Sequence, residues 1–530
     1  MIDPASTTFE ERRKQMLALV DEMRALEARV RANSERSRAK FEKRNQLLPR
    51  DRVALLLDPG APFLELSTLA GLKMHDDDGA DNAAGGGTIA GIGFVAGRRC
   101  MVTATDSGIK GGAVSPMGLK KGLRLQALAL ENRLPMVTLA ESAGANLLYQ
   151  DELFIEGGAS FANQARLSAA GLSQVTVVHG SSTAGGAYLP GLSDYVVVVR
   201  QKSKIFLAGP PLLKAATGEI ATDEALGGAE LHATVSGTAE YIAEDDAQAV
   251  SIARQIVSNL PEDPAPRGTS FRPPRYSPDE LAGVVPVDYK EAYDVREVIA
   301  RIVDASDFLE FKAAFGPLTI CGHAHIEGHP VGVIGNNGPI DPQGAVKAAQ
   351  FIQLCCQSNT PLIFLMNTTG YLVGVDAERG GIVKHGSKMI QAVANATVPK
   401  ITLVIGGSWG AGNYGMAGRG LGPRFIFSWP NAKVGVMGPQ QAAEVMEIIT
   451  REKTARRGMD MPQEFLDQMR EQLIERMEPQ TSALYGTARL WDDGLIDPRD
   501  SRRVLAFALA TCHRAAQHTV HPNSFGVARL

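Results

Sequence analysis

Short, continuous runs of apolar residues alternate along the chain with longer segments of helical periodicity. In the first half, a helical segment from Pro116 to Asn132 is followed by the mainly apolar run 135–139 and then by a glycine-containing turn. Continuous apolar runs are typical of strands that are covered on both faces of a sheet. The alternation of strand and helix therefore predicts βαβ units with right-handed crossovers, which places the chain in the α/β class.

The same pattern returns in the second half of the chain. The Pro-Met-Gly sequence at 116–118 corresponds to Pro-Gln-Gly at 342–344, which is an offset of 226 positions. The strand at 176–179 and its glycine turn at 184–188 recur at the same offset. A constant offset over about 70 positions, with Gly and Pro matching at the turns, indicates a duplicated domain rather than a solenoid.

A proline-rich stretch lies between the two halves, with seven prolines from Pro261 to Pro286. Proline lacks an N–H and fixes φ, so we expect an extended linker over the surface here, neither helix nor internal strand. The chain then divides into an N-terminal helical segment (1–50), a first domain (51–260), the linker (261–290) and a second domain (291–530).

Two further segments have clear patterns. Residues 8 to about 45 are rich in Arg, Lys and Glu, with Met16, Val20 and Met23 at helical spacing, which predicts a long, charged surface helix. The glycine-rich stretch 85–93 is followed by a second strand and not by a helix. It therefore predicts turns that open a β-meander, and it does not fit a dinucleotide-binding fingerprint.

Composition and charge exclude several classes of function. The 530 residues, of which 44% are hydrophobic and 21% charged, have the balance of a multidomain globular enzyme. A net charge of -4 gives no case for nucleic acid or for an anionic membrane surface. Five cysteines without CxxC spacing favour a reducing compartment and argue against a disulfide framework or a zinc ribbon. With no membrane-spanning run or signal peptide, a cytoplasmic location is expected.

Each half contains a glycine turn between an apolar strand and a helical segment. Ligands can approach the backbone closely at Gly185 and Gly186, and again at Gly410 and Gly412. The N–H groups at a helix start favour negative charge. Two such turns at matching positions of a duplicated domain indicate a pair of oxyanion holes rather than turns that merely allow tight packing.

At this point the chain resembles a known family, the carboxyltransferase subunits of biotin-dependent acyl-CoA carboxylases. The resemblance extends from about residue 10 to the C-terminus. It is carried by the segments Ser-Thr-Ala-Gly-Gly-Ala-Tyr at 182–188, Ile-Phe-Leu-Ala-Gly-Pro-Pro at 205–211 and Gly-Gly-Ser-Trp-Gly-Ala-Gly-Asn-Tyr-Gly-Met at 406–416. It is closest to the branch that acts on 3-methylcrotonyl-CoA and geranyl-CoA. The resemblance implies two crotonase-like (ClpP/crotonase) domains with an N-terminal helical extension.

The resemblance also implies what each half binds. The first domain would bind acyl-CoA and the second would bind biotin, and a site would form where one subunit's first domain faces another's second. The residues expected to stabilise the two oxyanions are Ala184, Gly185, Gly186, Ala411 and Gly412. Substrate-binding residues would be Ala143, Gly144, Ala145, Gly157, Gly158 and Ala187. Biotin-binding residues would be Thr369, Gly370, Gly410, Asn413 and Tyr414.

In this family, carboxybiotin releases CO2 and its ureido nitrogen takes the substrate proton, so no strong protein base is required. The chain has no Ala-Met-Lys-Met biotin acceptor and no sign of an ATP-grasp domain. Biotin should therefore be covalently carried by a partner, the biotin carboxylase and biotin carrier α subunit. The resemblance implies a β homohexamer within an α6β6 complex.

The substrate expected from the resemblance is a branched α,β-unsaturated acyl-CoA that is carboxylated on its γ carbon. Methylcrotonyl-type sequences carry a longer, bulkier segment where this chain has Phe-Ile-Glu-Gly-Gly-Ala-Ser at 154–160. Glycine in place of a bulky wall leaves room for a longer chain, which favours geranyl-CoA over 3-methylcrotonyl-CoA. Neutral drift of this segment is the alternative explanation.

Three other interpretations remain open. Glu141 and Glu152 could form the carboxylate pair of a crotonase-type enoyl-CoA hydratase, and the chain could act on another acyl-CoA or be an inactive scaffold. Cys321, His323, His325 and His329 would share one strand face, and we interpret them as a solvent-facing cluster rather than as metal ligands. No metal site is expected.

Overall fold

The computed structural model describes residues 2–75, 77, 83–264, 270–458 and 461–527. The chain forms two compact units, each with its own sheet. Unit 1 comprises Met1–Arg24, Arg267–Thr487 and Trp491–Ala510, and unit 2 comprises Ala25–Pro266, Ala488–Leu490 and Thr511–Leu530. Three helices of the described segments, α1 (Thr7–Glu35), α19 (Ala483–Ala488) and α20 (Ser501–Gln517), contribute residues to both units.

Unit 2 is built on a mixed sheet with the strand order β1-β2-β3-β4-β5-β6-β8. The hairpin β2–β3 is antiparallel, whereas β3, β4, β5, β6 and β8 run parallel, and β7 pairs with the end of β5. Its strands are β1 (Leu64–Glu65), β2 (Thr88–Val95), β3 (Arg98–Thr105), β4 (Met136–Ser142), β5 (Gln174–Thr183), β6 (Tyr195–Val199), β7 (Lys204–Phe206) and β8 (Tyr241–Ala243).

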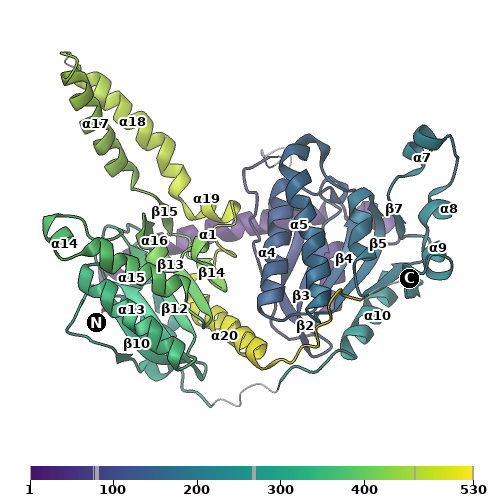
Figure 1. The fold of residues 1–530 in the computed structure, drawn as a ribbon, viewed down its shortest axis with the longest axis horizontal. Coiled ribbons are helices and arrows are strands. Elements are labelled where there is room, and N and C mark those ends of the chain that lie inside the picture. Colours follow the sequence, from purple (N-terminus) through teal and green to yellow (C-terminus); the bar gives the residue numbers. More distant parts are fainter. Residues whose placement is uncertain (1, 76, 78–82, 265–269, 459–460, 528–530) are drawn as a thin grey trace. The chain divides into compact units, whose positions relative to one another are not determined.

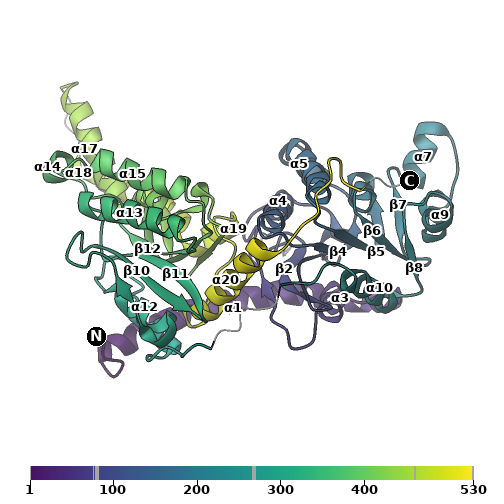
Figure 2. The same cartoon turned by 60° about the horizontal axis from the view of Figure 1, so that its bottom comes forward.

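Helices cover both faces of this sheet (Figure 2), with α4 and α5 on one face and α3 and α10 on the other. Val53 and Leu56 of α3 and Val250 and Val257 of α10 share one buried cluster with the central strands. The helices of unit 2 are α2 (Arg38–Lys43), α3 (Pro49–Leu56), α4 (Pro116–Glu131), α5 (Gln150–Ala169), α6 (Tyr188–Gly191), α7 (Pro210–Thr217), α8 (Asp223–Gly227), α9 (Ala229–Thr234) and α10 (Asp246–Ser258). Its 3₁₀ turns are η1 (Lys110–Gly112), η2 (Leu147–Tyr149) and η3 (Ala184–Ala187).

Unit 1 repeats this plan with the strand order β14-β13-β12-β11-β10-β9, and β15 pairs with the end of β13. Its strands are β9 (Leu309–Glu310), β10 (Thr319–Ile326), β11 (His329–Asn336), β12 (Leu362–Thr368), β13 (Lys400–Trp409), β14 (Phe425–Ser428) and β15 (Lys433–Gly435). The antiparallel pair β10–β11 corresponds to β2–β3, and β11 to β14 run parallel.

The helices α13 and α15 pack side by side on one face of this sheet, as α4 and α5 do in unit 2 (Figure 2). A pair of long helices, α17 and α18, lies side by side and extends away from the sheet of unit 1 (Figure 1). The remaining elements are α11 (Leu281–Val284), α12 (Val295–Ile302), α13 (Pro342–Gln357), α14 (Val375–Arg379), α15 (Ile382–Ala394), α16 (Gly412–Gly415), α17 (Pro439–Ala455), α18 (Gln463–Met477), α19 (Ala483–Ala488), η4 (Pro278–Glu280), η5 (Asp304–Ser306), η6 (Arg419–Leu421), η7 (Glu478–Thr481) and η8 (Pro498–Asp500).

The structure repeats the sequence duplication down to the strand register. Met136 pairs with Gln174 in the first copy, and Leu362 pairs with Lys400 in the second. Both copies then shift register at the same point, just before the pairs Ser142–Ser182 and Thr368–Ser408. Every one of these residues is related to its equivalent by 226 positions, so the repeat predicted from the sequence is confirmed as two copies of one α/β unit.

Two local expectations differ from the structure. The stretch between Pro278 and Val284 is not an extended surface linker, since η4 and α11 form there and residues 281–284 are buried. Pro278 occupies the first position of its turn, where a missing N–H costs nothing, so proline starts this segment instead of breaking it. The N-terminal helix forms as predicted, but Met16, Val20 and Met23 are buried.

Candidate active site

The first predicted turn follows directly from the end of β5. Ala184, Gly185 and Gly186 are the first three residues of the 3₁₀ helix η3, whose N-cap is Thr183. The N–H groups of Ala184 and Gly185 have no partner within such a helix, and the N–H of Gly186 is the first that bonds back, to the carbonyl of the N-cap. Ala184 has a φ of 53°, which turns the chain sharply out of the strand. The hydroxyl of Ser182 donates to the carbonyl of Gly186 at 2.8 Å and holds the turn closed.

The loop after β4 lies against this turn. Gly144 has a φ of 86°, and a Cβ built on it would lie 3.3 Å from the Cβ of Ala184. The N–H of Gly144 donates to the hydroxyl of Ser142 at 3.1 Å, and Ala145 forms a bridge to Val114. The structure thus brings the predicted residues of 143–145 together with those of 184–187 at the carboxyl ends of β4 and β5.

The second turn has the same construction. Gly410, with a φ of 54°, takes the place of Ala184 and donates its N–H to the carbonyl of Gly435 at 2.9 Å. Ala411 is the N-cap of α16 and Gly412 its first residue, so their N–H groups lie at an open helix start. Gly410 therefore shapes the turn, while Ala411 and Gly412 are the residues positioned to donate to a ligand.

A steric difference separates the two central positions of each turn. A Cβ on Gly186 would lie 3.0 Å from the hydroxyl oxygen of Ser142, and one on Gly412 would lie 2.8 Å from the Cα of Gly370. A Cβ on Gly185 would meet only the Phe161 ring, at an ordinary contact distance of 3.7 Å. The second copy carries alanine at that place, Ala411. A side chain is therefore sterically disfavoured at the Gly186 and Gly412 positions, and more strongly at Gly412, where the neighbour is backbone.

The other predicted residues are distributed around the two turns. Ala187 completes η3 and is buried, whereas Tyr414 in α16 is half exposed. The amide of Asn413 donates to the hydroxyl of Ser408 at 2.8 Å, so its side chain supports the second turn from within. Thr369 and Gly370 follow β12, and the carbonyl of Gly370 accepts the N–H of Ile340 at 2.9 Å.

Gly157 and Gly158 lie in the middle of α5, in a helix and not in a loop as their composition suggested. A Cβ on either glycine would meet nothing within 4 Å. Phe161 lies one helical turn further along, and its ring is the nearest group to Gly185. The two glycines therefore lie one helical turn from the ring that neighbours Gly185, and they carry no side chain on that part of α5.

Behind the first turn lies a buried cluster of charges. Arg52 donates to Glu141 at 2.9 Å and to Asp246 at 3.0 Å, and His179 lies 2.7 Å from the other oxygen of Asp246. Burial, together with the Arg52 charge, lowers the pKa of His179. Burial alone would raise the pKa of Asp246, but the hydrogen bond with His179 and the Arg52 charge outweigh burial and lower it.

This cluster argues against a hydratase site. A hydratase needs two carboxylates that share one water molecule and exchange protons with it. Glu141 is 6% exposed and is paired with the guanidinium of Arg52, so its side chain is engaged in a structural contact. Glu152 is half exposed and contacts His75 at 3.2 Å instead.

Sequence reasoning missed the hydroxyl groups that set the shape of the turns. Ser142 and its equivalent Thr368 accept the N–H of Gly144 and Gly370 at 3.1 and 3.2 Å. Ser182 and its equivalent Ser408 are both fully buried beneath the turns. The sequence repeat could have identified them, because each of the two hydroxyl residues in the first copy matches a hydroxyl residue of the second copy at the offset of 226 positions.

The structure also shows how the possible metal-ligating side chains are arranged. Among the described residues, no three His, Cys, Asp or Glu side chains are grouped so as to hold a metal ion. His329 begins β11 and does not continue β10, and Cys321 is buried, so the four residues do not form one solvent-facing strand face. None of the helices in the described segments is long and apolar enough to cross a membrane.

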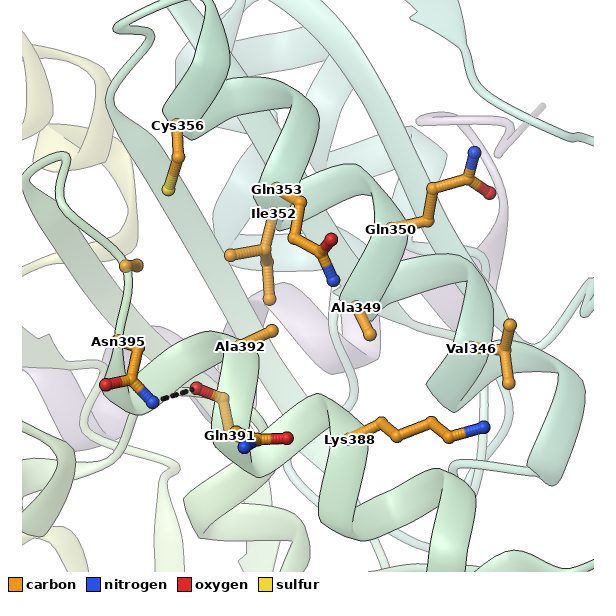
Figure 3. Close-up of a pocket in the computed structure, with 11 residues that line it drawn as sticks. Val346, Ala349, Gln350, Ile352, Gln353, Cys356, Lys388, Gln391, Ala392 and Asn395 are labelled. Atoms are coloured by element: carbon orange, nitrogen blue, oxygen red, sulfur yellow. Dashed lines mark hydrogen bonds between the residues drawn. The ribbon is translucent and has the colours of Figure 1, made fainter.

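A separate groove of about 590 Å³ lies between α13 and α15 (Figure 3). Its floor is formed by small and apolar side chains such as Ala349, Ile352 and Ala392, and its rim by carboxamides such as Gln353 and Gln391. It has none of the glycine turns or open N–H groups described above. Its lining therefore offers no oxyanion chemistry, and the candidate site remains with the two turns.

Comparison with known proteins places this geometry in context. The chain matches the family model of the carboxyl transferase domain over residues 40–526. It is 45% identical to the probable methylcrotonoyl-CoA carboxylase beta chain, mitochondrial, of Drosophila melanogaster, with 100% of this chain and 94% of that protein covered. It is 47% identical to the biotin-dependent 3-methylcrotonyl-coenzyme A carboxylase beta1 subunit of Mycobacterium tuberculosis, with 95% of each covered. The crystal structure of the P. aeruginosa geranyl-CoA carboxylase beta subunit is 60% identical, covers 100% of this chain and 99% of that one, and has a TM-score of 0.94. Agreement over the full length confirms the fold expected from the sequence.

Proposed function

Because the chain belongs to the carboxyl transferase family, as the carboxyltransferase of a methylcrotonoyl-CoA or geranyl-CoA carboxylase, we propose that its substrate is geranyl-CoA. The reaction would transfer a carboxyl group from biotin, carried by a partner subunit, to the γ carbon of the acyl chain. Two observations support this choice of substrate. The geranyl-CoA carboxylase beta subunit is 60% identical to this chain, and α5 carries no side chain at Gly157 and Gly158, where a Cβ would meet nothing within 4 Å.

In the first copy, the backbone N–H groups around Gly185, from Ala184 to Gly186, would hold the thioester oxygen. Removal of the γ proton sends charge through the double bond to that oxygen, which becomes an enolate. Preorganised donors that bind the enolate more strongly than the neutral thioester lower the barrier to its formation. Ala184 would provide the turn, while Ala143, Gly144, Ala145 and Ala187 would line the acyl site.

In the second copy, the N–H groups of Ala411 and Gly412 would hold the ureido oxygen of biotin. The open helix start at α16 fits this role, because its free N–H groups and the helix dipole favour a developing negative charge. When bound, carboxybiotin supplies the CO2 and a nitrogen that accepts the substrate proton. Thr369, Gly370, Gly410, Asn413 and Tyr414 would shape the pocket around the ring.

The charge cluster behind the first turn has a supporting part in this mechanism. A free carboxylate beside the forming enolate would oppose its negative charge. Arg52 neutralises Glu141 at this place, and Glu141 directly precedes the loop that carries Ser142 and Gly144. The guanidinium of Arg52 therefore offsets the charge of a carboxylate that borders the loop of the proposed acyl site.

The partner should be a biotin carboxylase and biotin carrier α subunit, with this chain as a β homohexamer in an α6β6 assembly. The names of the relatives support a beta-subunit role, since such subunits act with a second chain. A cytoplasmic location stays a prediction, which fractionation of cells would test.

The deciding experiment mixes the purified chain with its biotinylated partner and compares kcat/KM for geranyl-CoA and 3-methylcrotonyl-CoA. We expect a preference for geranyl-CoA of at least tenfold, which corresponds to about 1.4 kcal/mol. A preference for 3-methylcrotonyl-CoA would overturn the proposed substrate but not the carboxyl-transfer chemistry. Hydration of either substrate without biotin would instead support the hydratase interpretation.

A further inference from the structure

Two buried lysines lie at equivalent positions of the two copies. Lys121 in α4 and Lys347 in α13 are related by the offset of 226 positions, and their exposed fractions are only 2% and 0%. Burying an ammonium group costs free energy unless its N–H donors are satisfied. The proposed mechanism uses neither lysine, so their presence in both cores needs another explanation.

The ammonium group of Lys121 binds three backbone carbonyls. Its Nζ donates to the carbonyl oxygens of Ser67, Gly85 and Thr88 at 3.1, 3.1 and 2.7 Å. A lysine ammonium has three N–H donors, so these bonds use all of them. Ser67 follows β1, whereas Gly85 and Thr88 belong to the segment that enters β2. Lys121 therefore ties two separate segments to α4.

A close backbone contact lies one helical turn before Lys121. A Cβ on Gly118 would lie 2.5 Å from the carbonyl oxygen of Gly86, and a Cβ on Gly86 would lie 3.0 Å from the Cα of Gly118. The start of α4 and the loop before β2 thus touch through their backbones, and the ammonium group next to this contact holds them together.

The residues just before α4 connect this contact to the loop after β4. The N–H of Val114 donates to the carbonyl of Gly144 at 2.9 Å, and the carbonyl of Val114 accepts the N–H of Asn146 at 3.0 Å. A Cβ built on Gly144 would in turn lie 3.3 Å from the Cβ of Ala184 in the first turn. The position of the start of α4 therefore fixes the loop that lies against the first turn.

The second copy repeats this arrangement. The Nζ of Lys347 donates to the carbonyl of Gly316 at 3.5 Å, and a Cβ on Gly316 would lie 2.7 Å from the backbone nitrogen of Gly344. Ile340, two residues before α13, forms a bridge to Tyr371 in the loop after β12. Apart from Gly316, each of these residues matches its counterpart in the first copy at the offset of 226 positions. The longer bond of Lys347 makes the second contact the weaker one.

We propose that Lys121 and Lys347 are positioning residues, and that each fixes the start of its helix so that the adjoining loop is held at the oxyanion turn of its own copy. This inference rests on the proposed function, because it assigns the first turn to acyl-CoA and the second to biotin. Removal of the ammonium group leaves buried carbonyls without a donor, so the loop and the helix start move apart. Because each loop would line one ligand, each lysine should affect the binding of that ligand alone.

The test uses the complete enzyme, with the biotinylated partner, and four variants. Lys121→Met and Lys347→Met remove the ammonium group but keep an unbranched side chain. Gly118→Ala leaves Lys121 in place and directs a methyl group at the carbonyl of Gly86. Gly122→Ala is the matched control in the same helix, because a Cβ there would meet nothing within 4 Å. KM is measured for the acyl-CoA that the wild type prefers and for the partner, and thermal unfolding is recorded for each variant.

For Lys121→Met, we expect the KM for acyl-CoA to rise about tenfold, while the KM for the partner stays within about twofold. Lys347→Met should raise the KM for the partner instead, by about threefold because its bond is longer. Gly122→Ala should match the wild type. A protein that is merely less stable loses active enzyme, which lowers kcat and leaves both KM values unchanged. A loss confined to kcat in both lysine variants would therefore overturn the proposal.

The helix glycine decides the matter if Lys121→Met does not fold. Gly118→Ala disturbs the same contact from the other side, so it should also raise the KM for acyl-CoA and leave the KM for the partner unchanged. Unchanged KM values in Gly118→Ala, or equal increases in both, would reject the role of this contact.

The failure of this inference can be told apart from failure of the proposed function. If Lys121→Met raised the KM for the partner and Lys347→Met that for acyl-CoA, each lysine would position its own copy, but the two ligands would be assigned the wrong way round. If each variant raised both KM values, the lysines would not act on single copies. The proposed reaction would then still stand, because carboxylation by the wild type tests it independently.

Discussion

At the scale of single residues, the two oxyanion turns depend on one glycine each. Gly186 and Gly412 occupy equivalent positions, and a Cβ on either would come within 3.0 Å of a neighbouring atom. The neighbour of Gly186 is the hydroxyl of Ser142, and that of Gly412 is the backbone of Gly370. A side chain would therefore push the loop after β4 or β12 away from the N–H groups that we propose to bind the oxyanion.

We predict that Gly186→Ala lowers kcat by about a hundredfold or more, the size of effect seen when one oxyanion donor is lost. The physical reason is displacement of Ser142 and of the Gly186 N–H by the new methyl group. The measurement is steady-state carboxylation with the biotinylated partner, together with circular dichroism to confirm the fold.

The chain offers a matched control for this prediction. Gly185→Ala places its methyl group at an ordinary distance from Phe161, and the second copy already carries Ala411 at that position. This variant should retain kcat to within about threefold. If Gly185→Ala were as damaging as Gly186→Ala, the argument from close contacts would be wrong.

At the scale of elements, the two copies support the same register shift with different chemistry. In the first copy, Glu141 stands at the shift and binds Arg52. In the second, Asn367 stands there, and its side-chain oxygen accepts the N–H of Gly407 at 2.7 Å. A buried ion pair in the first copy and a neutral amide in the second thus occupy equivalent positions at the register shift.

The ion pair makes a prediction about stability. Arg52→Met would leave Glu141 and Asp246 as two buried carboxylates without their shared cation, which should destabilise the protein by about 3–5 kcal/mol. Glu141→Gln leaves Arg52 paired with Asp246, so it should cost clearly less. Urea unfolding of both variants measures the order. Equal losses of unfolding free energy in the two variants would show that Arg52 is not the shared partner of both carboxylates.

The segment between α19 and η8 carries a buried carboxyl group with a shifted pKa. Burial raises the pKa of Asp492 to about 6, although hydrogen bonds with Thr487 and Ser428 oppose this effect. The folded state therefore binds this proton more tightly than the unfolded state. The contribution of Asp492 to the stability of the fold is largest below pH 4. It is lost as the pH rises through about 6, because the ionised form of the side chain is buried.

Asp492→Asn should remove this cost, since its side-chain oxygen can still accept the N–H of Gly494. We expect a melting temperature a few degrees above that of the wild type at pH 7, with at most about 3 kcal/mol involved. The difference should shrink toward pH 4. Melting curves between pH 4 and 8 provide the measurement, and a gain that does not depend on pH would assign the effect to packing.

Some elements could be predicted from the sequence and others could not. Strands β5 and β13 and their turns were predictable, because apolar runs ending in glycine are local signals. The helical state of Gly157 and Gly158 was not, since two glycines oppose a helix locally and packing of α5 on α4 overrides them. The prolines from Pro278 to Pro286 likewise led to a wrong prediction of an extended linker, because the effect of proline depends on its position in a turn.

At the scale of the whole molecule, the duplication was the most predictable feature. Gly and Pro at turns match across 226 positions, and this offset is independent of how the chain folds. The partners of Arg52 were not predictable, because Glu141 and Asp246 are distant from it in sequence and only the fold brings the three residues together. Tertiary charge networks have no local signal that could identify them.

The family resemblance predicts that each site combines the first domain of one subunit with the second domain of another. Gly186→Ala should disable only the turn that we propose for acyl-CoA, and Gly412→Ala only the turn that we propose for biotin. If sites form between chains, complexes reassembled from a one-to-one mixture should contain some sites in which an intact first turn meets an intact second turn, about a quarter of the total for random mixing in a symmetric oligomer. The mixture should therefore recover carboxylation that neither variant shows by itself, as measured after joint unfolding and refolding with the partner. A site formed within one chain predicts no recovery, because every chain carries one disabled turn. Refolded mixtures of each variant with the wild type control for losses during reassembly.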